Sequence, residues 1–209
     1  MKTLEDWRLY WSGRTGVNRI ELVDYCVAGV AMTHEAYMRA VVLPNLAALD
    51  VQKNCDILEI GCGTGLHLDA LDQFARRLVG TDISETLLST YKGRAETFVC
   101  AAADQPFEIA SFDRVLMAGV ALYFPSDSYF EDVLRLIKSL LRPNGRALIA
   151  DMLFGDFISK SGYRAYDMHV VMAMLDRLEV DWQITNQTLE KRNINTRYNI
   201  VLKLSNDLS

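Results

Sequence analysis

Residues 56–65 read DILEIGCGTG, a short and mostly apolar run with strand character that leads into three alternating glycines. Glycine lets the backbone turn sharply and leaves room for a ligand beside the main chain, because it has no Cβ. The helix expected after this turn begins with N–H groups that have no partner within the helix. The stretch therefore predicts that a small ligand binds at the turn.

An acid follows at the end of the next predicted strand. Asp82 lies twenty-one positions after Gly61. A carboxylate at this place in an α/β sheet can accept hydrogen bonds from both hydroxyls of a ribose. The turn and the acid together predict a nucleoside-containing cofactor.

Apolar runs with strand character alternate with helical patterns from residue 56 onward. Continuous hydrophobicity suits strands that are covered on both faces. The expected strands are residues 56–60, 78–82, 97–101, 114–118 and 147–152, followed by an antiparallel hairpin of residues 180–188 and 196–204. This order predicts an α/β fold with a seven-stranded, mostly parallel sheet and helices on both faces.

Two apolar stripes have the i, i+3, i+4, i+7 spacing of a helix that packs one face on a sheet. They are Leu71, Phe74, Ala75 and Leu78, and Phe130, Val133, Leu134 and Ile137. Ser128 and Glu131 predict a capping box at the start of the second helix, and Pro143 predicts its end. Residues 1–50 look helical, with Pro44 interrupting the second apolar pattern.

Composition restricts the class of protein. The 209 residues are 50% hydrophobic and 23% charged, which is typical of a folded globular chain. The net charge of −5 supplies no attraction for nucleic acid or anionic lipid. The longest apolar run is about half of a membrane span, and no apolar signal segment or C-x-x-C pair is present. We therefore expect a cytoplasmic protein with no membrane, nucleic-acid or metal site.

The glycine spacing is G-x-G-x-G, and Leu66 stands where the dinucleotide fingerprint needs a small residue, which argues against a nicotinamide-dependent oxidoreductase. With VGTDIS at 79–84, FDRV at 112–115 and LRPNG at 141–145, the chain resembles the class I S-adenosylmethionine-dependent methyltransferases over about residues 55–152. The resemblance implies a Rossmann-like fold and S-adenosylmethionine as the cofactor. It also implies a lid at about residues 153–179. The length and the absence of a linker predict one domain over residues 1–209, with a helical cap at about 1–50 and an α/β core at 51–209.

The resemblance assigns cofactor contacts to several positions. It places the glycine turn under the methionine and ribose, Glu59 toward the amino group, Asp82 on the ribose hydroxyls and Ile83 on the adenine. For the adenine edge it leaves open a contact from Asp104, whose alternative is a solvated loop acid, or from the amides of Ala102 or Ala103. The implied cofactor-binding residues are Glu59, Gly61, Cys62, Gly63, Gly65, Asp82, Ile83, Ala102, Ala103, Asp104, Met117 and Ala118.

The methyl acceptor is expected to lie beyond Met117 and Ala118. This segment lacks the Asn/Asp-Pro-Pro-Tyr/Phe signature of base-modifying amino-methyltransferases, and the chain has no Pro-Cys nucleophile. These absences and the negative net charge favour a small-molecule acceptor that is methylated at oxygen or nitrogen. The alternative is a catalytically silent subunit that binds the cofactor or a protein partner. The pattern leaves the oligomeric state open.

Catalytic residues are hard to name, because displacement at a sulfonium needs alignment more than acid or base assistance. Tyr123 and His169 are the candidates, whereas His67 is expected to be a buried helix residue. Trp7, Tyr10 and Trp11 share one helical face, which predicts either ordinary packing or an aromatic wall over the cofactor. The substrate or lid candidates are Tyr10, Trp11, Arg14 and Tyr166.

Overall fold

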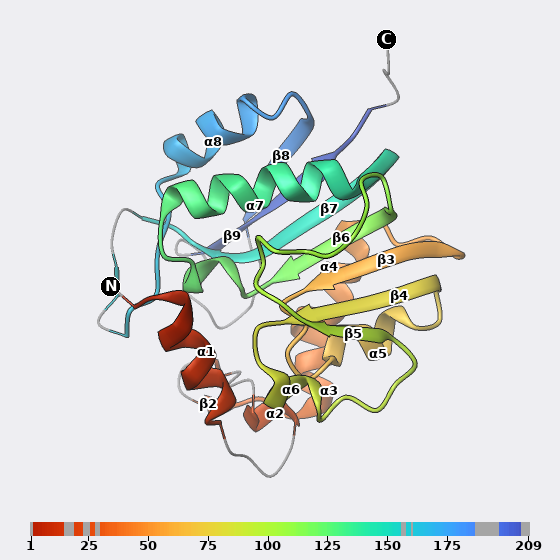
Figure 1. The fold of residues 1–209 in the computed structure, drawn as a ribbon, viewed down its shortest axis with the longest axis vertical. Helices are drawn as coiled ribbons and strands as arrows, with labels where there is room; N and C mark the ends of the chain where they lie inside the picture. The colour runs from red at the N-terminus through yellow and green to blue at the C-terminus, as the bar shows by residue number, and fades with distance from the viewer. Residues whose placement is uncertain are drawn as a thin grey trace.

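The computed structural model describes residues 2–14, 19–22, 26–27, 30–155, 158–159, 161–186 and 197–205. A seven-stranded sheet forms its centre (Figure 1), with the strand order β5-β4-β3-β6-β7-β9-β8. The strands are β3 (Cys55–Ile60), β4 (Ala75–Asp82), β5 (Glu96–Val99), β6 (Phe112–Ala118), β7 (Leu141–Leu153), β8 (Asp181–Asn186) and β9 (Arg197–Lys203). Neighbours among β3 to β7 pair in parallel, whereas β9 is antiparallel to both β7 and β8. The predicted sheet and its closing hairpin are confirmed.

Helices lie on both faces of the sheet, as predicted, and also across its carboxyl end. They are α1 (Leu4–Ser12), α2 (Arg19–Leu22), α3 (His34–Tyr37), the π-helix η1 (Met38–Val42), α4 (Leu43–Leu49), α5 (Leu66–Leu71), α6 (Glu85–Leu88), the 3-10 helix η2 (Ala121–Tyr123), α7 (Asp127–Leu140) and α8 (Met168–Asp176). Within the part of the chain that the structure describes, no helix has the length and hydrophobicity needed to cross a membrane.

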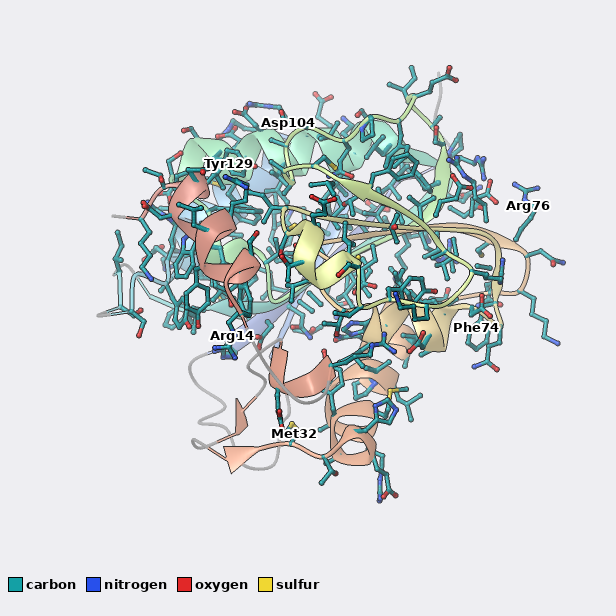
Figure 2. All side chains as sticks on the ribbon, turned by 60° about the horizontal axis from the view of Figure 1, so that its bottom comes forward. Arg14, Met32, Phe74, Arg76, Asp104 and Tyr129 are labelled. Atoms are coloured by element: carbon teal, nitrogen blue, oxygen red, sulfur yellow. The ribbon has the colours of Figure 1, made fainter. Side chains whose placement is uncertain are left out.

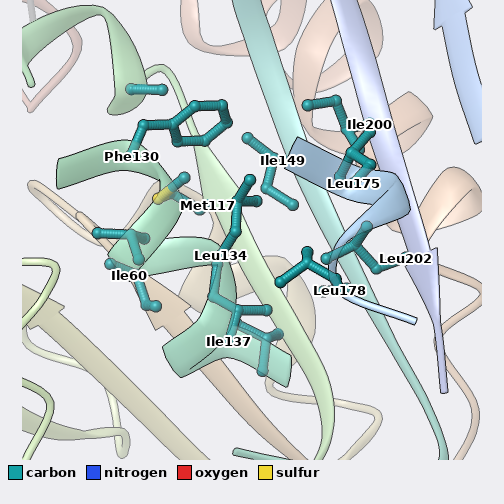
Figure 3. Close-up of a cluster of buried hydrophobic side chains, with 14 of the residues drawn as sticks. Ile60, Met117, Phe130, Leu134, Ile137, Ile149, Leu175, Leu178, Ile200 and Leu202 are labelled. Carbon is teal, nitrogen blue, oxygen red and sulfur yellow. The ribbon is translucent and has the colours of Figure 1, made fainter. Parts of the chain in front are cut away.

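Alternating side chains of the strands build two separate cores. On β6, Val115 and Met117 join the cluster that α7 and α8 cover, whereas Leu116 joins the cluster under α3, η1, α4 and α5. Figure 3 shows the first cluster, in which Phe130, Leu134 and other side chains of α7 meet the sheet. Each such apolar side chain contributes roughly 1.5–3 kcal/mol when it is fully buried. The α7 stripe predicted from the sequence therefore packs on this face of the sheet and buries it.

The other predicted stripe is wrong as a helix. α5 ends at Leu71, and Ala75 and Leu78 belong to β4, where they pair with β3. Phe74 lies in the turn between them, where its amide donates to the Leu71 carbonyl. Four apolar residues at helical spacing therefore span a helix end, a turn and a strand start, because each of the three segments packs an apolar residue against the same core cluster.

The predicted limits of α7 also need correction. Ser126, not Ser128, is its N-cap, since the Ser126 hydroxyl accepts a hydrogen bond from the Tyr129 amide at 3.1 Å. Glu131 pairs with arginine side chains instead of closing a capping box. The helix ends at Leu140, and Pro143 lies within β7.

The amino-terminal segment is not wholly helical. Residues 26–27 and 30–31 form a two-stranded antiparallel ribbon, β1 (Cys26–Val27) and β2 (Val30–Ala31). Pro44 does not break its helix, because it lies in the first turn of α4, where a proline needs no amide donor. The π-turn of η1 precedes it directly.

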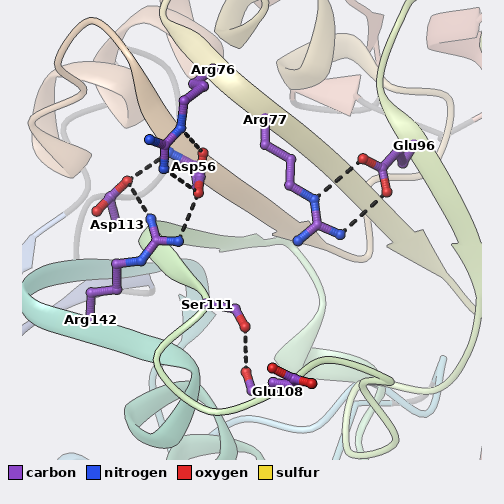
Figure 4. A network of polar contacts seen from close by, with 8 residues as sticks. All are labelled: Asp56, Arg76, Arg77, Glu96, Glu108, Ser111, Asp113 and Arg142. Carbon is purple, nitrogen blue, oxygen red and sulfur yellow. Dashed lines mark hydrogen bonds and ion pairs between the residues drawn. The ribbon is translucent and has the colours of Figure 1, made fainter.

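An ionic network ties four adjacent strands together at the amino end of the sheet (Figure 4). The Asp56 carboxylate of β3 binds Arg76 of β4 at 2.7 Å and Arg142 of β7 at 2.8 Å. Arg142 also binds Asp113 of β6 at 3.0 Å, and the Asp113 carboxylate accepts the Asp56 amide at 2.7 Å. Hydrogen bonds from Arg76 and Arg142 outweigh the cost of burial and lower the pKa of Asp56 to about 2.

We predict that Asp56→Asn lowers the free energy of unfolding at pH 7 by about 2 kcal/mol, because a lowered pKa measures the preference for the charged form in the folded state. The Asp56 carboxylate contributes to the free energy of unfolding above its unfolded pKa of about 4, and this contribution is lost as pH falls toward 2. Urea unfolding of both proteins between pH 2.5 and 7 measures it. Glu96→Gln, which removes an exposed partner of Arg77, is the matched control with little expected change. A pH-independent difference would contradict the prediction.

Candidate cofactor and acceptor site

The glycine turn after β3 is bound directly to β4. The amides of Gly61 and Cys62 donate to the Thr81 carbonyl at 2.7 and 2.9 Å. Gly61 has φ 72° and Gly65 has φ 79°, a region that favours glycine. A Cβ at Gly61 would collide with the side chain of Val120, which lies two residues after the end of β6. The glycines are therefore required both by the backbone conformation and by close packing.

Asp82 closes the same turn from the end of β4. Its Oδ2 accepts the Gly63 amide and its Oδ1 accepts the Ser84 amide, each at 2.8 Å. The residue is only 8% exposed. Desolvation raises the pKa of Asp82 to about 6 and outweighs the backbone hydrogen bonds that lower it. The acid expected to hold a ribose is thus in place and oriented before any ligand binds.

Glu59 lies beneath the turn as part of a buried polar chain. Its Oε1 is 3.1 Å from Nδ1 of His67, and Nε2 of His67 is 3.0 Å from Nδ2 of Asn45. Burial raises the pKa of Glu59 against the opposing effect of His67. The second oxygen, Oε2, is buried without a hydrogen-bond partner among the described residues. His67 is therefore a buried residue of α5, as predicted, but it is not merely apolar packing.

These groups line a cavity of about 300 Å³ at the carboxyl end of the strands. One part of its wall comes from the glycine turn and the ends of β4 and β6, and another comes from α1, η2 and β7. The polar and backbone elements that line it include Glu59, Gly61, Cys62, Gly63, Thr64, Asp82, Ala102, Ala118, Gly119 and Asp151. The cavity therefore extends from the predicted cofactor cradle to the part of its wall formed by α1, η2 and β7, which we call its second compartment.

Aromatic rings form the wall of that second compartment. Trp7 and Trp11 of α1 contact Tyr123 of η2 edge to face, with ring centroids 4.7 and 5.5 Å apart. Tyr163 stacks on Trp7 at 5.6 Å. All four line the cavity. Desolvation raises the pKa of Tyr123 well above its usual value, so its phenol stays protonated at neutral pH.

Sequence reasoning missed a charged pair at the far side of this compartment. Asp151, near the end of β7, binds Arg197 of β9 at 2.6 Å, and both line the cavity. Asp151 has φ 67°, and its amide donates to the Asn199 side chain at 3.0 Å. Left-handed backbone at a non-glycine residue is strained and is often found at functional sites. An acid at the carboxyl end of the expected strand 147–152 was the available signal.

The structure brings most of the predicted positions together. Those that line the cavity are Glu59, Gly61, Cys62, Gly63, Asp82, Ile83, Ala102, Ala118, Trp11 and Tyr123. Gly65 and Met117 do not line it. Gly65 serves the turn, since its amide donates to the Cys62 carbonyl at 2.8 Å, and Met117 is fully buried in the sheet core.

Of the residues predicted to contact the adenine edge, only some line the cavity. Asp104 is exposed and does not line the cavity, which agrees with the alternative of a solvated loop acid. The amide of Ala103 already donates to the Tyr129 hydroxyl at 3.2 Å. Figure 2 labels Asp104 and Tyr129 near the amino end of α7. Of these positions, Ala102 lines the cavity.

Four substrate or catalytic candidates lie outside the cavity wall. Tyr166 is buried and donates to the Ala121 carbonyl at 2.8 Å, and His169 is exposed in the first turn of α8. Tyr10 packs edge-on against Trp7 and Trp11 without lining the cavity. Arg14, which follows α1 (Figure 2), donates to the Glu21 carbonyl at 2.8 Å. None of these four residues lines the cavity.

Comparisons with known proteins agree with this architecture. Residues 58–149 match the family model described as a methyltransferase domain. An uncharacterized methyltransferase of Schizosaccharomyces pombe is 30% identical over 115 residues, which cover 47% of this chain and 39% of the relative. The tRNA U34 carboxymethyltransferase of Idiomarina loihiensis is 31% identical over 113 residues, which cover 48% of this chain and 34% of the relative. The chain therefore spans less than half the length of these curated relatives.

A solved structure with a similar fold is Burkholderia thailandensis 1,6-didemethyltoxoflavin-N1-methyltransferase with bound 1,6-didemethyltoxoflavin and S-adenosylhomocysteine. It superimposes with a TM-score of 0.62 at 20% identity, covering 82% of this chain and 79% of that chain. Residues 58–149 are therefore similar to a methyltransferase domain, and the fold is shared with methyltransferases of known structure. These matches support the predicted resemblance.

S-adenosylmethionine is the cofactor that the methyltransferase-domain match indicates, and the site fits it. The glycine turn has no Cβ in the way, Asp82 presents a carboxylate for the ribose hydroxyls, and Glu59 offers an unpaired buried oxygen. Among the described residues, no group of three or more metal-binding side chains could hold an ion.

We predict that affinity for 5′-methylthioadenosine, which keeps the adenosine part of the cofactor, falls roughly tenfold between pH 7 and pH 5, because the Asp82 carboxyl becomes protonated as pH drops through about 6. Calorimetric titration at several pH values measures the change. Asp82→Asn should bind weakly at every pH, and Asp104→Asn, outside the cavity, should keep the wild-type profile. A flat wild-type profile would rule out this role of the carboxylate.

Proposed function

We propose that the protein transfers a methyl group from S-adenosylmethionine to oxygen or nitrogen of a small molecule. The observation that carries the proposal is one cavity that reaches from the glycine turn and Asp82 to the aromatic wall of Trp7, Trp11 and Tyr123. An acceptor in the aromatic compartment would lie beside the cofactor and away from bulk water. Alignment of two reactants in one enclosed space can supply much of a displacement rate.

When bound, the cofactor supplies an electrophilic methyl group on a positively charged sulfur. The residues of the chain bind and orient. We assign Asp82 to the ribose hydroxyls, Glu59 to the amino group, and the backbone of Ala118 and Gly119 to the region beside the sulfur. The aromatic rings exclude water, and they also favour a cation through their π faces.

On the acceptor side we assign Asp151 as the hydrogen-bond acceptor for a hydroxyl or amine. Its pairing with Arg197 keeps an oriented carboxylate in an otherwise aromatic compartment. Tyr123 is protonated at neutral pH, so its role is that of a hydrogen-bond donor and wall, not that of a base. His169 lies outside the cavity wall, and we assign it no catalytic role.

We further propose that the whole chain works as one domain, in which residues 1–50 cap the cavity and residues 153–179 form its lid. Support comes from contacts of α1 on two sides. Tyr163 stacks on Trp7, and the Thr86 hydroxyl at α6 donates to the Ser12 carbonyl at 3.1 Å. α1 therefore links the expected lid to the cofactor side of the sheet.

The acceptor is proposed to be a small molecule although three relatives, that of Idiomarina loihiensis among them, are named for action on tRNA. The charge of −5 gives this chain no overall attraction for a polyanion. The aromatic compartment is also closed by α1, whose Trp7 is only 3% exposed. Both observations favour a free metabolite over a base within a nucleic acid.

We expect the purified protein to bind S-adenosylhomocysteine saturably in calorimetry and to release it from S-adenosylmethionine when an acceptor is present. A panel of phenols, alcohols, amines, carboxylic acids and a transfer-RNA transcript, read by S-adenosylhomocysteine formation, tests the acceptor class. Turnover of the transcript alone would contradict the small-molecule proposal. Binding without turnover, together with a co-purifying protein partner, would favour a catalytically silent subunit.

We predict that Trp11→Ala lowers kcat/KM at least tenfold for whichever small acceptor is methylated, while affinity for S-adenosylhomocysteine changes less than threefold. The reason is that Trp11 contacts Tyr123 in the acceptor compartment, so its loss loosens the alignment of the acceptor. Steady-state kinetics and calorimetry measure the two effects. Leu9→Ala, at a 57% exposed position of the same helix, is the control and should change neither. Equal losses in both constants would contradict an acceptor role.

A further inference from the structure

The buried chain of Asn45, His67 and Glu59 is more elaborate than packing requires. The three residues are 3%, 4% and 2% exposed, and they come from α4, α5 and β3. Buried polar groups are costly unless they are hydrogen-bonded. All three line the cavity. These three residues therefore form a polar connection from the amino-terminal segment to the cofactor site.

The donor and acceptor roles along this chain follow from chemistry. Nδ2 of Asn45 can only donate, so the Nε2 atom of His67, 3.0 Å away, must accept. A neutral imidazole then carries its proton on Nδ1, which points at Oε1 of Glu59 at 3.1 Å. His67 is thereby held as a neutral donor to Glu59, and Asn45 fixes which nitrogen holds the proton.

One acid oxygen is left over. Oε2 of Glu59 is buried and has no hydrogen-bond partner among the described residues, and Glu59 is one of the residues that line the cavity. Arg197 is the one permanently cationic side chain among the described lining residues, and it is paired with Asp151. The unsatisfied oxygen therefore calls for a cationic donor that comes with the ligand.

We propose that Asn45 and His67 are positioning residues that orient Glu59, so that its free oxygen receives the ammonium group of the cofactor's methionine part. This inference rests on the proposed cofactor binding and deepens it. It assigns part of the affinity for the amino-acid end of the cofactor to Asn45, in the segment before the first strand of the sheet. A group that acts through Glu59 in this way influences the ammonium but not the adenosine.

Two ligands separate this role from a purely structural one. S-adenosylhomocysteine carries the ammonium group, whereas 5′-methylthioadenosine lacks the whole amino-acid part. We expect His67→Leu to lower the affinity for S-adenosylhomocysteine at least tenfold in calorimetry and to change the affinity for 5′-methylthioadenosine less than twofold. Glu59→Gln should give the same pattern, and His67→Gln, which keeps an N–H donor, should recover most of the affinity. His34→Leu, at an exposed residue of α3, is the control.

Equal weakening of both ligands by His67→Leu, or no weakening of either, would overturn the positioning role. If the wild-type protein binds neither ligand, the proposed function itself fails, which is a different result. Nitrogen NMR of the imidazole in the wild-type protein adds a readout that needs no variant to fold. A neutral His67 protonated on Nδ1 is expected, and protonation on Nε2 would overturn the inference.

Discussion

The hydrogen bond from the Gly63 amide to the Asp82 carboxylate is the contact on which the rest of the site depends. It joins the turn after β3 to the end of β4 at 2.8 Å, where neighbouring parallel strands end at the same edge of the sheet. A hydrogen bond to a charged group is worth about 1.5–3 kcal/mol. Here it offsets part of the desolvation that raises the pKa of Asp82 to about 6. The turn and the acid therefore hold each other in the geometry that an adenosyl group needs.

The two ends of the sheet use the same residue types in opposite ways. At the amino end, Asp56 has two arginine partners and a pKa near 2, so its charge stabilises the fold. At the carboxyl end, burial raises the pKa of Asp82 and of Glu59, and neither contacts an arginine in the described structure. Buried acids without cationic partners are a cost to folding, which a ligand that donates hydrogen bonds or carries a positive charge can relieve. Figure 2 shows Arg76 and α1 at opposite ends of the molecule. The ionic network that stabilises the fold is therefore separate from the site that binds the ligand.

Local patterns predicted what local physics determines. Continuous apolar runs predicted five strands of the main sheet, and the two stretches at 180–188 and 196–204 predicted its antiparallel hairpin. The glycine turn with Asp82 predicted where the cavity lies. The stripe from Leu71 to Leu78 misled, because helical spacing is equally satisfied by a helix end that turns into a strand. The pairs Asp151 with Arg197 and Asn45 with His67 could not be predicted, since they join segments that only the folded sheet brings together. Residue type alone does not specify such long-range partners.

The division between local and long-range determinants follows the division of the cavity. The glycine turn and the two acids assigned to the cofactor, Glu59 and Asp82, lie in one continuous stretch, β3 to β4. The acceptor end takes Trp7 from α1, Tyr123 from η2, Tyr163 from the following segment and Arg197 from β9. A change in any of these four segments alters the acceptor compartment without disturbing the Gly63 to Asp82 contact. Acceptor choice can therefore vary independently of cofactor binding, because the two are held by separate parts of the chain.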